Sequence, residues 1–348
     1  MVAILHTCGD FIARRTVLRS GSVLFLGCPT VARGASGWWE SYCARFINPD
    51  GRVIDDAHRN GTHSEGQAWA MLLATRVGDE ATFDRLRGWT LRHLACRPDA
   101  LLAWLWRPEY GVADRNNATD ADLYHALALT EAERLWPWKQ LGREVQRITE
   151  DCLRVLLRRA GGMSFLLPGA NGFEGRWHID INPSYIAPRI FRTLHARTGN
   201  PQWSILARDG SRFLETALFS RWQLPPDWVR LSLFTGGLSP VPGRNFRFSY
   251  DALRVPLNLA WAADERHPAF QALARFWARE FPPPPAWVSL DDGRLSPLRG
   301  DEGHTAVQAL TSGIGTRVSG ELPGRYYAAT LSVLCHEIMR ERTVGARA

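Results

Sequence analysis

Residues 61–74 read GTHSEGQAWAMLLA, and this stretch decides the fold because it predicts a buried helix with a carboxylate in its first turn. Ser64 is expected to be the N-cap, with Gln67 three residues later completing a capping box. The seven residues that follow Gln67 are apolar on every side, which is typical of a buried helix. Glu65 stands beside Gly66, which has no side chain, so we expect its carboxyl to face a cavity. The alternative is that Glu65 only complements the helix dipole.

The same pattern occurs twice more along the chain. Residues 117–122, NATDAD, open a predicted helix that carries Asp120 in its first turn. Residues 249–252, SYDA, open another that carries Asp251, and Pro256 must kink this helix or fall within its first two turns. One such helix is ordinary capping, but three of them predict an acidic site built from helix N-termini.

The composition is that of a large globular protein. The chain has 348 residues, of which 45% are hydrophobic and 22% are charged, and its formal net charge is +7. No basic run is interleaved with aromatic residues, which excludes the nucleic-acid-binding classes. The 15 tryptophans exceed an ordinary share; stacking on sugar rings would explain some of them, and core packing is the expected role of most.

The first 35 residues resemble an export signal. Arg14 and Arg15 precede a short apolar stretch at residues 22–27, as in twin-arginine signals, and that stretch is too short to remain as a membrane span. Small residues allow cleavage after Ala32 or Ala35. We therefore expect residues 1–35 to be removed and the protein to be periplasmic or secreted.

Cysteine usage gives no sign of a metal or disulfide framework. Four cysteines lie beyond residue 35 without a Cys-x-x-Cys pair, and we expect them to be buried free thiols: Cys43, Cys96, Cys152 and Cys335. Because there is also no His-x-x-x-His pattern, the sequence predicts no metal site and no cofactor.

Helical patterns follow one another across residues 36–348 without a linker, which predicts one all-α domain. We expect helices at residues 37–47, 64–77, 79–95, 119–136, 138–159, 182–198, 202–217, 249–263, 267–280, 304–317 and 325–341. Apolar helices alternate with charged, amphipathic ones, as in two concentric rings of helices. The connections that enter the apolar helices are long, so we expect them to gather at one end of the domain, where function usually resides. Residues 163–180 predict a small hairpin in these loops, turning at Asn171-Gly172.

Three blocks carry a resemblance to a known family. Residues 64–67 (SEGQ), 118–122 (ATDAD) and 249–254 (SYDALR) resemble glycoside hydrolase family 8, and residues 182–185 (NPSY) and 226–230 (PDWVR) add to the match. The likeness is greatest to its periplasmic endoglucanases associated with bacterial cellulose synthesis. It implies an (α/α)6 barrel, an inverting mechanism on β-1,4-linked glucan and an association with the cellulose synthesis machinery.

The resemblance also implies roles for the three acids. Glu65 matches the general acid, Asp251 the general base, and Asp120 an acid that holds the sugar at the cleavage point. Inversion requires two carboxyls about 6.5 to 9.5 Å apart, which helix N-termini across a barrel mouth can supply. A helix N-terminus favours an ionised carboxyl, so burial or the charge of Asp120 must keep Glu65 protonated. Arg254, three residues after Asp251, is expected to keep that base ionised.

Aromatic residues are candidates for sugar-binding platforms, since the CH faces of glucose stack on aromatic rings. The candidates are Trp104, Trp106, Trp177, Tyr185, Trp228 and Tyr250. The chain also departs from the family pattern at His63, Trp69-Ala70 and His125. These departures affect the expected substrate subsites more than the expected reaction.

Two alternatives stay open from the sequence. The first is another polysaccharide, namely chitosan, xylan or mixed-linkage glucan, although the basic net charge disfavours cationic chitosan. The second is a non-catalytic glucan-binding accessory with the same fold. The joint presence of the three acids and Arg254 disfavours this second alternative, because a binding protein needs no acid and base pair.

Overall fold

The computed structural model describes residues 36–279, 284–314, 318 and 321–345. Residues 33–348 group as one compact unit, and the expected export signal lies outside the described residues. The described residues contain eleven α-helices: α1 (Ser36–Phe46), α2 (Ser64–Val77), α3 (Glu80–His93), α4 (Thr119–Leu135), α5 (Gly142–Asp151), α6 (Pro188–Thr198), α7 (Pro201–Thr216), α8 (Arg254–Trp261), α9 (Pro268–Trp277), α10 (Glu302–Thr311) and α11 (Tyr326–Gly345). The prediction of a mostly helical protein is therefore confirmed.

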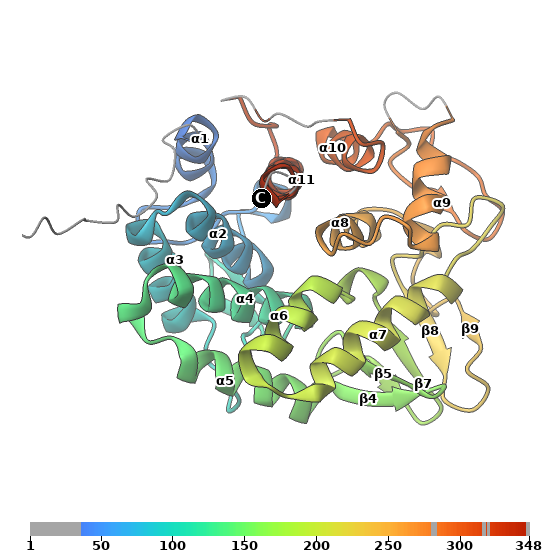
Figure 1. Cartoon of the computed structure of the whole chain (residues 1–348), viewed down its shortest axis with the longest axis horizontal. Helices are drawn as coiled ribbons and strands as arrows, with labels where there is room; N and C mark the ends of the chain where they lie inside the picture. The colour runs from blue at the N-terminus through green and yellow to red at the C-terminus, as the bar shows by residue number, and fades with distance from the viewer. Residues whose placement is uncertain (1–35, 280–283, 315–317, 319–320, 346–348) are drawn as a thin grey trace, which may run out of the picture. The chain divides into compact units, whose positions relative to one another are not determined.

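The most apolar helices form the centre of this unit. Residues 66–75 of α2 and all eight residues of α8 are buried, as their apolar sequences predict. Figure 1 shows α2, α4, α6, α8 and α11 near the centre, with α3, α5, α7 and α9 outside them. Each outer helix packs against the inner helix that precedes it, giving the pairs α2–α3, α4–α5, α6–α7 and α8–α9. Buried and half-exposed helices thus alternate along the chain.

Short strands occupy the long loops between these helices. They are β1 (Thr62–His63), β2 (Leu105–Arg107), β3 (Gly111–Asp114), β4 (Leu157–Ala160), β5 (Met163–Leu166), β6 (Glu174–Gly175), β7 (His178–Ile181), β8 (Val229–Ser232), β9 (Leu238–Ser239), β10 (Arg247–Phe248) and β11 (Val288–Ser289). All pairs are antiparallel, and β6–β7–β8–β9 form a four-stranded sheet. This sheet links the loop before α6 to the loop before α8.

The predicted hairpin at Asn171-Gly172 is wrong in position. The hairpin is formed by β4 and β5, which pair from Leu157↔Leu166 to Ala160↔Met163 across the turn Gly161-Gly162. Both glycines have positive φ, which a tight turn between two strands favours. The helix expected at 138–159 ends early. Its last residues form β4, which follows a short π-helix at Cys152–Leu156.

The predicted capping box at the start of α2 is also wrong. His63 is the N-cap, and the buried Ser64 hydroxyl has no hydrogen-bond partner. The Gln67 side chain accepts a bond from the Val53 backbone N–H at 2.6 Å and donates to Thr90 Oγ1 at 2.9 Å. Gln67 therefore ties α2 to the preceding loop and to α3. Among the described residues, no helix combines the length and apolar character that a membrane span requires.

Candidate active site

The three predicted acids converge on one buried arginine. Arg254 is 4% exposed, and its Nη1 atom contacts both Glu65 Oε1 and Asp120 Oδ2, the latter at 2.7 Å. Its Nη2 atom donates to Asp251 Oδ1 at 3.0 Å. One guanidinium thus joins carboxylates that lie up to 186 residues apart in sequence, as Glu65 and Asp251 do. The sequence-predicted group of Glu65, Asp120, Asp251 and Arg254 is brought together.

Two of these acids lie in the first turn of a helix and the third does not. Glu65 and Asp120 are the second residues of α2 and α4. Asp251 lies in a turn three residues before α8, which begins at Arg254. The expected helix at 249–263 is therefore wrong at its start, and Pro256 is the third helical residue, where its missing N–H breaks no helical hydrogen bond.

Asp120 is the most enclosed of the three acids. Its side chain is buried beneath the site, and burial, with the neighbouring Asp251 charge, raises its pKa to about 7. Hydrogen bonds from the Ala121 N–H and from Tyr185 act in the opposite direction. The contact with Arg254 at 2.7 Å also favours the ionised form of this carboxyl.

Asp251 is more open, with a side chain that is 36% exposed. Its Oδ2 atom accepts a hydrogen bond from Trp228 Nε1 at 3.0 Å. The pKa of Asp251 is raised by burial, although Trp228 and nearby arginines Arg244 and Arg247 lower it. Arg254 lies on this carboxyl as expected, at 3.0 Å from Oδ1, and the role of Arg254 in keeping Asp251 ionised stays a prediction.

Sequence reasoning missed Asp227, which anchors the turn that carries Asp251. Its Oδ1 atom accepts hydrogen bonds from the backbone N–H groups of Ser249 and Ala252, both at 2.9 Å. Asp227 is buried, and burial and the Asp251 charge raise its pKa to about 7. Its place in the PDWVR block could have marked Asp227 as a functional residue. The backbone groups that it binds could not be predicted, because they depend on the tertiary structure.

An open cavity of about 530 Å³ lies over this group. Glu65, Asp251 and Arg254 line it together with Tyr250 and Tyr327. Tyr327, which the sequence did not single out, donates a hydrogen bond to the Tyr250 carbonyl at 2.8 Å and so fixes the residue next to Asp251. A pair of carboxyls beside an aromatic-lined cavity is an arrangement that can bind a sugar chain and transfer protons to it.

Comparison with known proteins gives a family. The model of glycosyl hydrolases family 8 matches residues 18–335. The chain belongs to this family. It is 35% identical over 318 residues to a probable endoglucanase of Novacetimonas hansenii, covering 88% of this chain and 91% of the relative. It is 36% identical to an endoglucanase of Cellulomonas uda over 79% of this chain and 77% of that one.

The fold agrees with solved structures of the family. The endo-β-1,4-glucanase CMCax of Acetobacter xylinum superposes with a TM-score of 0.82 at 34% identity, covering 88% of this chain and 98% of that one. The similarity therefore extends over nearly the whole described part of this family 8 glycosyl hydrolase.

Four of the predicted substrate-binding residues border the site in this family 8 protein. Arg254 and Tyr250 line the cavity, and Tyr185 and Trp228 contact Asp120 and Asp251. Trp228 is also sandwiched, since its ring stacks on Phe173 at 5.5 Å and Arg244 lies 3.9 Å from its ring centroid. These contacts hold the indole N–H on Asp251.

The other three predicted substrate-binding residues, Trp104, Trp106 and Trp177, make their ring contacts elsewhere. Trp104 is half-buried next to the His63 ring, at 5.6 Å. Trp106 packs against Trp89 at 5.4 Å in a separate hydrophobic cluster. Trp177 is 50% exposed and pairs with Phe234 at 4.7 Å beside the four-stranded sheet. None of these three rings contacts the three acids.

Proposed function

We propose that this chain is an inverting endo-β-1,4-glucanase that hydrolyses cellulose-like glucan. The observation that carries the proposal is the convergence of Glu65, Asp120 and Asp251 on the guanidinium of Arg254 beneath an open cavity. The endoglucanase names of the relatives support the β-1,4-glucan substrate. An acid and a base on opposite faces of the sugar suffice for hydrolysis with inversion.

Glu65 is the proposed general acid. It is 19% exposed at the cavity wall and contacts Arg254 in the substrate-free site. A general acid must carry its proton when the leaving sugar departs. The bound glucan must therefore take the place of the Arg254 contact and remove water from around Glu65.

Asp251 is the proposed general base and Asp120 the acid that holds the sugar. Trp228 and Arg254 each donate to a different oxygen of Asp251, which fixes the plane of its carboxyl. Such fixation orients the lone pair that would take a proton from the attacking water. The buried Asp120 lies beside it and offers hydrogen bonds to a sugar hydroxyl.

A comparison of two variants tests these roles. Glu65→Gln should abolish hydrolysis of unactivated glucan yet retain activity on substrates with an acidic leaving group, which departs without a proton. Asp251→Asn should gain little from a better leaving group, but added azide should restore turnover. The opposite pattern of rescue would mean that the two roles are exchanged. NMR of the wild-type products should show inverted anomeric configuration, and retained configuration would refute the mechanism.

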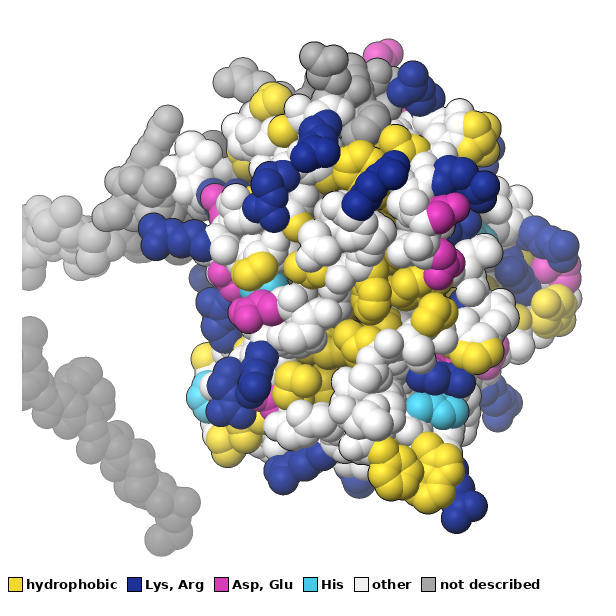
Figure 2. Space-filling model, turned by 90° about the vertical axis from the view of Figure 1, so that its right-hand side faces the viewer, with side chains coloured by type: hydrophobic (Ala, Val, Ile, Leu, Met, Phe, Trp, Pro, Cys, Tyr) yellow, Lys and Arg dark blue, Asp and Glu magenta, His cyan; other side chains and the backbone are white. Residues whose placement is uncertain are grey.

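The substrate is tested by product analysis. We expect hydrolysis of carboxymethyl cellulose to exceed that of chitosan, xylan and lichenan. Figure 2 shows dark-blue Lys and Arg side chains spread over the face that it presents, in keeping with the net charge of +7, and such a surface disfavours a cationic polymer such as chitosan. Faster hydrolysis of any of the three other polymers would reassign the substrate.

We further propose an (α/α)6 barrel for residues 36–348, with residues 1–35 as a twin-arginine export signal. The alternation of buried and half-exposed helices supports the barrel. An exported glucanase would act in the periplasm or outside the cell, where the cellulose synthesis machinery is a natural partner. Fractionation of the producing cells tests the location.

A further inference from the structure

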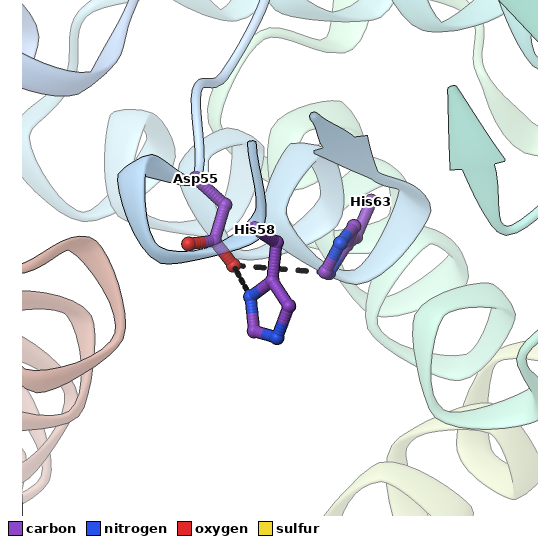
Figure 3. A group of neighbouring side chains, drawn as sticks. All are labelled: Asp55, His58 and His63. Carbon is purple, nitrogen blue, oxygen red and sulfur yellow. Dashed lines mark hydrogen bonds and ion pairs between the residues drawn. The ribbon is translucent and has the colours of Figure 1, made fainter. Parts of the chain in front are cut away.

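We propose that Asp55, His58 and His63 form a binding site for a divalent transition-metal ion such as Zn²⁺ in the wall of the active-site cavity. Figure 3 shows the three side chains facing one another from the loop that precedes α2. One ligand atom from each lies within 4.8 Å of the other two, and no other such group of His, Cys, Asp and Glu occurs in the described part of the chain. The pattern Asp-x-x-His-x-x-x-x-His was not recognised from the sequence.

The distances between the ligand atoms suit a small adjustment to tetrahedral coordination. Asp55 Oδ2 lies 2.7 Å from His58 Nδ1 and 4.0 Å from His63 Nδ1. Ligands of tetrahedral Zn²⁺ at about 2.0 to 2.1 Å are roughly 3.3 Å apart. The first distance must lengthen and the second must shorten by less than 1 Å. The two histidine nitrogens lie within 4.8 Å of each other and must also come closer, and rotations of the imidazole rings supply these changes.

The surrounding contacts already orient these ligands. Asp55 Oδ1 accepts a hydrogen bond from the Ala57 N–H at 3.0 Å, which leaves Oδ2 for the histidines. The Asp55 N–H donates to the Gly61 carbonyl at 2.9 Å and closes the loop between them. His63 is the N-cap of α2, and its ring lies against Trp104. Such outer contacts raise metal affinity by reducing the reorganisation that binding requires.

The donor set selects the class of ion. Two imidazole nitrogens and one carboxylate oxygen suit Zn²⁺, Cu²⁺, Ni²⁺ or Co²⁺, whereas Ca²⁺ and Mg²⁺ prefer oxygen ligands. Arg107 opposes a cation here, because its Nη1 atom contacts the His58 carbonyl. Arg52 also lies in this loop, donating to the Asn60 carbonyl at 2.8 Å, so the carboxylate of Asp55 must supply the local negative charge for the ion. With three protein ligands, the ion keeps a fourth position for water.

Occupancy of this site has a consequence for the cavity. Asp55, His58 and His63 line the same cavity as Glu65 and Asp251. A bound ion and its water would take up part of the space next to Glu65, so we expect Zn²⁺ to slow glucan hydrolysis and a chelator to restore it. This consequence rests on the proposed function, whereas binding of the ion does not.

The test is isothermal titration of the untagged full chain with ZnCl₂, in the absence of substrate. We expect one site, lost or weakened at least roughly tenfold in His58→Ala, since even the loss of an outer-shell contact costs about that much. His58 is exposed, so this variant should fold, and circular dichroism checks it. His195→Ala is the matched control, because that histidine lies on α6 and its ring is hydrogen-bonded to the Asn200 carbonyl, away from the proposed ligands; it should bind as wild type does. MgCl₂ should give no comparable binding.

Several results would overturn the proposal: no binding of Zn²⁺ by wild type, unchanged binding by His58→Ala, or equal loss in His195→Ala. Binding without glucanase activity would refute the proposed function alone. Activity on glucan with no Zn²⁺ binding would refute the metal site alone.

Discussion

Asp227→Asn should make the protein more stable at high pH while leaving its stability at low pH nearly unchanged. The Asn side chain keeps an oxygen in the position of Oδ1, which accepts the N–H groups of Ser249 and Ala252. What the substitution removes is the ionisation of a buried carboxyl, together with its 3.6 Å ion pair with Arg247 Nε, which already acts within the net rise of the pKa. It therefore separates the charge of Asp227 from its hydrogen bonds.

The size of the expected stability gain follows from the shifted pKa of Asp227. The pKa of Asp227 rises from 3.8 to about 7 in the folded protein, so the folded state binds more protons than the unfolded state between these values. The free energy of unfolding must then fall as pH rises through this window. A shift of about 3 units at 1.36 kcal/mol each sets an upper limit of about 4 kcal/mol. Because Asp251 contributes to the shift, we expect about 2 to 4 kcal/mol.

Urea denaturation of wild type and variant at pH 4, 6 and 8 measures this difference. The stability gain of Asp227→Asn should be near zero at pH 4 and largest at pH 8. Asp227→Ala is the control, since it deletes both hydrogen bonds and should cost about 2 kcal/mol at pH 4, where the charge is absent. A gain that is independent of pH, or a loss at pH 8, would refute the reasoning.

Three other substitutions have definite expected outcomes. Arg254→Lys keeps the charge but loses the fork that joins three carboxylates, so kcat on glucan should fall at least about 100-fold. Gly66→Ala would place a Cβ 2.7 Å from Tyr326 Oη, so thermal unfolding should show a loss of about 1 to 3 kcal/mol. Tyr326→Phe in the same chain should recover much of that loss, and failure to do so would locate the clash elsewhere. Replacing Arg14 and Arg15 by Lys should leave the protein in the cytoplasm on cell fractionation; unchanged export would exclude a twin-arginine signal.

The helices and the acids were predictable because their signals are local. The apolar run after Glu65 predicted α2 at 64–77, which are the bounds observed. The family motifs identified Asp120, Asp251 and Arg254, and the structure brings all of them to one place. Hydrophobic periodicity and short motifs depend on residues that are close in sequence. A helix such as α2 and the motif acids can therefore be predicted from the sequence alone.

The errors concern residues whose partners are distant in sequence. Gln67 follows the capping-box spacing, yet its amide binds Val53 and Thr90 because these backbone and hydroxyl groups are buried and need partners. Glu65 faces a cavity as expected, but the missing side chain of Gly66 has a further role that the sequence did not show, since it leaves room for Tyr326 of α11. In both cases the local pattern was compatible with two roles, and the tertiary structure decided between them: Gln67 satisfies buried polar groups, and Gly66 lets a helix pack closely.

The shared guanidinium of Arg254 gives the three acids one physical constraint. Arg254 has two terminal nitrogens for three carboxylates, and its Nε has no hydrogen-bond partner. A sugar that displaces Glu65 from Nη1 leaves Asp120 and Asp251 still bound, so the proposed acid can be released while the proposed base stays fixed. Glu65, whose contact with Arg254 must break, lies at the cavity wall. Asp120 contacts the same nitrogen and is buried below Glu65. Substrate entry and protonation of Glu65 would thus be one event, because the same ligand removes both its water and its cation.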